Sequence, residues 1–152
     1  MTSAHFELDC AISLEDVSEI RRLVERLHLR RGSSESDASR IAMTTHELLE
    51  NAIKFSLDGI AMLRIEVTPA GEVVVRTRNR ASADDRRDLA ALAAELHAAA
   101  DPLTFYVSLM ARAPQERGGL GLGRVAAEGD MAIDFDFHDD VVEVSARSAL
   151  AA

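Results

Sequence analysis

Hydrophobic positions repeat with two different periods along this chain, and each change of period marks the boundary of a predicted element. Apolar and polar residues alternate in short runs that predict strands at residues 5–12, 60–68, 72–78, 131–137 and 141–146. Apolar residues spaced by three and four predict helices that begin after Ser13, in the Ser-rich stretch after Gly32, after Ser82, after Asp101 and before Gly129.

This order of elements predicts one domain over residues 1–152 with an α+β fold. We expect a two-layer α/β sandwich, in which helices cover one face of a mostly antiparallel, mixed sheet. Residues 112–123 contain four glycines and are predicted to form a loop. The helix after Asp101 has apolar positions at helical spacing, namely Leu103, Tyr106, Val107 and Met110.

Composition and charge narrow the classes of function. The chain has 152 residues, of which 47% are hydrophobic and 4% aromatic, so one domain can bury a core built from aliphatic side chains. The net charge of −9 argues against nucleic acid as a partner. The single cysteine, Cys10, permits no internal disulfide and indicates a reducing compartment. No apolar run has the length of a signal sequence or a membrane span, so we expect a cytoplasmic protein that does not bind membranes.

The segment HELLENAIKFS, residues 46–56, carries the clearest candidate chemistry. On a helix, Glu47, Asn51 and Lys54 fall on one stripe, and mostly apolar residues fall on another. A base, an amide and a cation are thereby presented together, which is typical of a site for a metal and a phosphate. The alternative is a solvated helix face with a Glu50–Lys54 charge pair.

A second candidate is the glycine-rich segment RGGLGLGRV, residues 117–125. Glycines allow backbone N–H groups to converge on an anion, and a helix that follows adds the positive end of its dipole. The segment differs from a dinucleotide-binding fingerprint because a helix and a polar loop precede it, where that motif needs a strand. The alternative is a surface loop that binds no ligand.

Together, the E-L-x-x-N-A-x-K helix and the later G-L-G-L-x-x-V segment resemble the Bergerat ATP-binding fold of gyrase, Hsp90, histidine kinases and MutL, the GHKL superfamily. The resemblance covers nearly the whole chain. Within the superfamily, the short length and the N-terminal strand followed by two helices look most like the anti-sigma factor serine/threonine kinases.

This resemblance implies ATP and Mg²⁺ as cofactors. It implies that Asn51 holds Mg²⁺ between the phosphates, that Glu47 is the general base, and that Lys54 contacts a phosphate. It further implies that the phosphates are surrounded by the backbone of Gly119, Leu120, Gly121 and Leu122. The reaction would be phosphoryl transfer to a serine or threonine of a small protein, achieved by positioning and charge neutralisation.

The chain departs from the family at the first glycine box, which should read Asp-x-Gly-x-Gly after a strand. Asn79 stands about where the family's aspartate hydrogen-bonds to the adenine amino group, and Ala81 adds a Cβ where the base must approach. In the second glycine box, Arg117 replaces the first glycine.

Two hypotheses follow from these observations. The first is an ATP-binding switch that phosphorylates or sequesters a small antagonist-type (STAS-like) or sigma-factor-like partner in bacterial signalling. The second is a non-catalytic, partner-binding regulator that keeps the fold without ATP. The resemblance also implies a homodimer, and it places residues 83–111 in the variable lid, where they are expected to contact a partner. The histidines and Cys10 show no zinc-ligand spacing.

Overall fold

The structure is a computed structural model of the chain and describes residues 4–10, 12–112 and 120–149. The elements occur in the order β1 (Ala4–Cys10), α1 (Leu14–Arg30), α2 (Glu35–Lys54), β2 (Ala61–Val67), β3 (Glu72–Arg80), α3 (Ala83–Ala98), α4 (Pro102–Met110), α5 (Leu120–Ala127), β4 (Ala132–His138) and β5 (Val141–Ala149).

The strands form one sheet in the order β1-β2-β3-β5-β4, and each neighbouring pair of these described strands is antiparallel. The register aligns apolar residues across the sheet, for example Ile65 with Val75 and Val75 with Ala146. Because side chains alternate between the two faces of a strand, this register collects the apolar ones on a single face.

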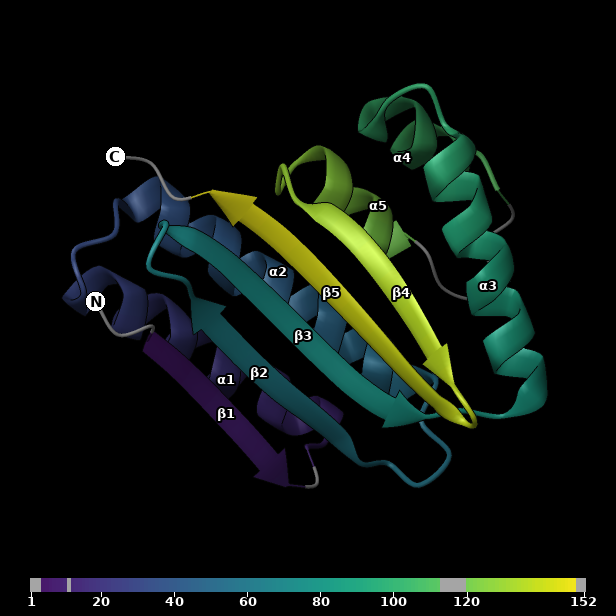
Figure 1. The fold of residues 1–152 in the computed structure, drawn as a ribbon, viewed down its shortest axis with the longest axis horizontal. Helices are drawn as coiled ribbons and strands as arrows, with labels where there is room; N and C mark the ends of the chain where they lie inside the picture. Colours follow the sequence, from purple (N-terminus) through teal and green to yellow (C-terminus); the bar gives the residue numbers. More distant parts are fainter. Residues whose placement is uncertain (1–3, 11, 113–119, 150–152) are drawn as a thin grey trace.

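Helices α1, α2 and α5 cover that apolar face, while α3 and α4 lie beside the β4 edge (Figure 1). The core lies between the layers, where Leu48 and Leu49 of α2, Leu63 of β2 and Val75 of β3 are at most 1% exposed. The opposite face of the sheet carries charged side chains such as Arg76 and Glu143. The predicted α+β fold, a two-layer sandwich with helices on one face of the sheet, is confirmed.

Local signals in the sequence set most of the element boundaries. Ser34 and Ser82 accept hydrogen bonds from the backbone N–H groups of Asp37 and Asp85, each at 3.1 Å, and so cap the starts of α2 and α3. The turn between β2 and β3 uses Gly71 at a φ of +84°, a conformation that glycine adopts without steric cost.

The structure departs from the sequence prediction in three places. Strand β3 continues past residue 78 to Arg80, so that Asn79 lies within the strand. Helix α5 begins at Leu120, within the segment expected to be a loop, and it contains Gly121 and Gly123. In α4, the predicted apolar positions largely face outward, whereas Phe105 and Leu109 are buried.

Candidate functional site

Helix α2 presents the three predicted residues as the sequence indicated, but with different exposure. The side chain of Glu47 is 15% exposed and that of Lys54 is 54% exposed, while Asn51 is half-buried. The buried side of the helix includes Ile41, Leu48 and Ala52, which pack into the core. Burial of the apolar stripe therefore fixes the direction in which Glu47 and Asn51 point.

Helix α5 packs directly against Glu47. A Cβ atom at Gly121 would lie 2.4 Å from the Glu47 Oε2, so only a glycine leaves the carboxylate its present position. One helical turn further on, Arg124 Nη1 lies 3.3 Å from Glu47 Oε1. The structure thus brings together a carboxylate from α2 and the first turn of α5, two parts of the chain that the sequence analysis had linked.

Arg124 was not singled out from the sequence. Its guanidinium also donates from Nε to the Glu128 Oε2 at 2.9 Å, and this hydrogen bond, together with the charge of Glu47, raises the pKa of Arg124 above its ordinary value. The sequence could have pointed to Arg124 through its position three residues after Gly121, because residues three apart lie on the same side of a helix. Arg124 gives Glu47 a fixed cationic partner in this structure.

The two remaining residues of the α2 stripe differ in their contacts. The Asn51 side chain makes no hydrogen bond within the described part of the chain. Lys54 Nζ lies 3.1 Å from Glu50 Oε1, so the Glu50–Lys54 pair weighed as the simpler alternative is present. Glu50 is also 3.2 Å from His46 Nε2. Asn51 is therefore the member of the stripe whose polar group has no partner among the described residues.

Asn79 and Ala81, which the family resemblance aligns with the first glycine box, are both buried. Asn79 is 5% exposed and donates from Nδ2 to the Arg80 carbonyl at 3.2 Å. Ala81 is 0% exposed and belongs to the hydrophobic core. Its N–H donates to the Asp140 carbonyl at 2.8 Å, and its own carbonyl accepts from Arg86 at 2.7 Å. Protein atoms thus occupy the Nδ2 group of Asn79 and both backbone groups of Ala81, whereas the Asn79 Oδ1 accepts no hydrogen bond from the described residues.

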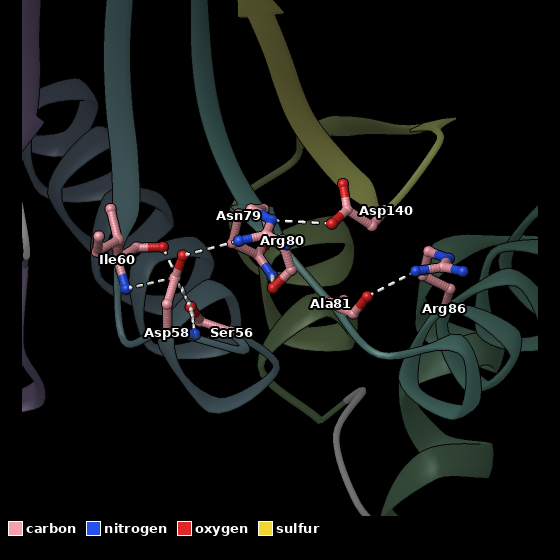
Figure 2. A network of polar contacts seen from close by, with 8 residues as sticks. All are labelled: Ser56, Asp58, Ile60, Asn79, Arg80, Ala81, Arg86 and Asp140. Carbon is pink, nitrogen blue, oxygen red and sulfur yellow. Dashed lines mark hydrogen bonds and ion pairs between the residues drawn. The ribbon is translucent and has the colours of Figure 1, made fainter.

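A polar network holds the same segment from the outside (Figure 2). Arg80 Nε donates to the Asp140 Oδ2 at 2.8 Å, and Arg80 Nη1 lies 3.7 Å from Asp58 Oδ2. Asp58 also accepts hydrogen bonds from the Ile60 N–H and the Ser56 hydroxyl, and these lower the pKa of its carboxyl. The end of β3 is therefore tied to the α2–β2 loop on one side and to the β4–β5 turn on the other.

These contacts test whether the residues fit an adenine nucleotide. Two cavities lie near the predicted positions. One, of about 240 Å³, touches Asn79 and is lined by Ile60, Met62 and Val141 among others. The other, of about 270 Å³, lies between Phe55 and α3. Neither is lined by Glu47 or Asn51.

In the half of the site that would hold the base, the Ala81 methyl lies in the core and the Ala81 N–H is bonded to the Asp140 carbonyl, which argues against the approach of an adenine base at this residue. The half that would hold phosphates retains Glu47, Asn51 and the first turn of α5. Of the predicted phosphate-binding backbone, Leu120, Gly121 and Leu122 lie in α5, and Gly119 lies outside the described residues. The roles assigned to all of these residues stay predictions.

No three side chains of His, Cys, Asp or Glu within residues 4–10, 12–112 and 120–149 gather where they could share a metal ion. None of the helices formed by these residues combines the length and apolar character needed to cross a bilayer.

Comparison with known proteins gives a likeness of fold. No family model matches the chain, and no curated protein matches it. Among solved structures, a chain from the SiaB-SiaC complex of Pseudomonas aeruginosa is similar, with a TM-score of 0.65 and 19% sequence identity over 96% of this chain and 89% of that chain. The likeness extends over nearly the whole of both chains, and at this identity it concerns the fold alone.

Proposed function

We propose that this chain is a regulatory protein of bacterial signalling that acts by binding a small protein partner, without needing a bound nucleotide. The observation that carries the proposal is an apolar stripe on the outside of α4. Leu103, Val107 and Met110 are 62%, 52% and 53% exposed. Their spacing of four and three residues places all three on one side of the helix.

Such a stripe is costly to leave in water and is typical of a surface that another protein covers. Isolated exposed apolar residues are common, whereas a row of large ones on one helix face marks a contact site. Positions i, i+4 and i+7 are the anchors through which a helix docks against an apolar groove. No residue of α4 is charged, so no charge has to be desolvated when this face is covered.

Two further observations support the proposal. A structure with a similar fold was solved as a complex of SiaB with SiaC. In addition, α4 lies within residues 83–111, the segment expected from the sequence to contact a partner. An antagonist-type (STAS-like) domain is the class of partner that the family resemblance implies.

The direct test is a capture experiment with and without the stripe. The double variant Leu103→Glu, Val107→Glu should lose a small bacterial regulatory protein that the unchanged chain retains. Leu14→Glu in the first turn of α1 is the matched control, because Leu14 is 52% exposed and an acidic residue is favourable at a helix start. Retention should not depend on Mg-ATP. Equal retention by the double variant and the control would contradict the proposal.

A second candidate is an ATP-dependent protein serine/threonine kinase or switch. It is favoured by the contact of Gly121, in the first turn of α5, with Glu47 and by the side chain of Asn51, one turn further along α2, which has no partner within the described residues. The burial of Ala81 argues against it.

A thermal unfolding measurement separates the two candidates. A ligand at about 100 times its Kd stabilises a protein by about 2.7 kcal/mol. Under the first candidate, millimolar Mg-ATP produces no shift. Under the second, a shift is present, Asn51→Ala abolishes it, and Glu47→Gln retains the shift but stops phosphate transfer to the captured partner.

A further inference from the structure

A cavity of about 210 Å³ lies between α1 and the strands β1 and β2, away from the residues discussed above. Its apolar lining comes from Phe6, Val24, Leu27, Ile65 and Val67, and its polar lining comes from His28 and Arg31. An engineered cavity of about 150 Å³ with an apolar lining is known to hold benzene. The volume and the lining are therefore suited to an apolar body at least as large as one aromatic ring.

His28 is a polar group without a partner in this apolar setting. Its side chain is 7% exposed and makes no hydrogen bond or ion pair within the described residues. Burial, and secondarily the nearby Arg31, lowers the pKa of the imidazole. A neutral imidazole has one N–H donor and one acceptor nitrogen, and neither is bonded to another of the described residues. A ligand in the cavity would supply a partner.

Arg31 adds a positive charge to the same cavity. It follows the last residue of α1 as the C-cap, it is exposed, and it has no ion pair within the part of the chain that is described. Several arginines of this acidic protein have carboxylate partners, as Arg40 has in Asp37 and Arg80 has in Asp140. Arg31 is thus available to an anion, and a guanidinium binds a carboxylate with two parallel hydrogen bonds.

We propose that this cavity binds a small carboxylate with an apolar body of about the size of an aromatic ring. The body lies against the aliphatic and aromatic lining, and the carboxylate meets Arg31. The His28 N–H is the second donor. This site is independent of the α4 surface and of any nucleotide.

Phenylacetate is a suitable probe, and phenylacetamide is its uncharged counterpart. Titration of the full chain, followed by methyl resonances in NMR spectra, should show saturable shifts at Val24, Leu27, Ile65 and Val67. Phenylacetate should bind more tightly than the amide by about tenfold, because the charge-assisted hydrogen bonds to Arg31 exist only for the acid.

Arg31→Gln should remove this preference and leave the weaker binding of the amide unchanged. Arg30→Gln is the matched control, since Arg30 is an exposed neighbour at the end of α1 that does not line the cavity. His28→Gln, which keeps a donor, should bind phenylacetate more tightly than His28→Leu. The proposal is overturned if neither compound gives saturable shifts at the lining methyls, if acid and amide bind equally, or if Arg30→Gln has the same effect as Arg31→Gln.

Discussion

Gly121 of α5 and Glu47 of α2 lie so close that a single added carbon at Gly121 would be 2.4 Å from the Glu47 carboxylate oxygen. The added carbon would lie 3.6 Å from the Glu47 Cβ, which is an ordinary van der Waals contact. The obstacle is therefore the carboxylate group alone. Arg124 holds that group at 3.3 Å and limits how far it can swing away.

This contact predicts an interaction between substitutions at the two positions. In the protein that keeps Glu47, Gly121→Ala should leave the free energy of unfolding nearly unchanged or lower it. The gain in helix propensity, at most about 1 kcal/mol, is offset by displacement of the carboxylate. In a Glu47→Ala background the same change should stabilise. Urea unfolding of all four proteins gives the coupling energy, which we expect to be about 1 kcal/mol. Equal effects in both backgrounds would contradict the contact.

Gly123, two residues further along α5, faces α4. A Cβ there would lie 2.9 Å from Leu109 Cδ1 and 3.3 Å from the backbone Cα of Tyr106, so α4 itself would have to move. Gly123→Ala should therefore lower the free energy of unfolding by about 1–3 kcal/mol, as overpacking of a core does. Gly121→Ala in the Glu47→Ala background serves as the control, and a stabilised Gly123→Ala protein would contradict the close approach.

The buried His28 predicts a pH dependence of stability. Because its folded-state pKa is below the ordinary value of 6.5, the unfolded chain takes up this proton first as the pH falls. The free energy of unfolding should decrease as the pH falls through 6.5 until the folded protein also binds the proton, by at most about 1.4 kcal/mol per pH unit.

Urea unfolding between about pH 5.5 and 7.5 measures this dependence. His28→Leu should flatten it, whereas His97→Gln at an exposed position of α3 should leave the contribution of His28 in place. The lowered pKa values of Asp58, Asp101 and Asp140 act at lower pH, since those carboxyls contribute stability that is lost only as the pH falls below their ordinary value of 3.8. An unchanged slope in His28→Leu would refute the assignment.

The burial of the Ala81 methyl predicts a loss of stability when glycine is placed at this position. Ala81→Gly removes a fully buried methyl group, worth about 0.8 kcal/mol, and adds about 0.5–1 kcal/mol of unfolded-chain freedom. The free energy of unfolding should fall by about 1–2 kcal/mol. Ala70→Gly, in the exposed turn before β3, should cost only the chain-freedom part. Equal losses at the two positions would show that the Ala81 methyl is not packed.

The order of the elements could be predicted because each one carries its own local signal. Ser34 and Ser82 mark helix starts by their capping hydrogen bonds, and alternation marks the strands. The start of α5 could not be predicted in this way. Glycines at residues 121 and 123 indicate a loop by propensity, but tertiary packing places them in a helix, where the missing Cβ allows close approach to Glu47 and to α4.

The exposed side of α4 was missed for a different reason. Helical periodicity finds apolar stripes, and polar residues on the other side usually show which stripe is buried. Because α4 has apolar residues on both sides and no charge, the pattern alone could not distinguish Leu103 and Val107 from the buried Phe105 and Leu109. The predicted closeness of Glu47 to the glycine-rich segment is present at Gly121, whereas the pairing of Glu47 with Arg124 depends on the path of α5.

The hydrogen bond from the Ala81 N–H to the Asp140 carbonyl leaves few residues that position 81 can accept. Glycine would keep this bond but lose a buried methyl group, proline would have no N–H to donate, and a larger side chain would have to fit into the core. Each of these changes lowers stability, so alanine is expected to persist at this position among descendants of this chain.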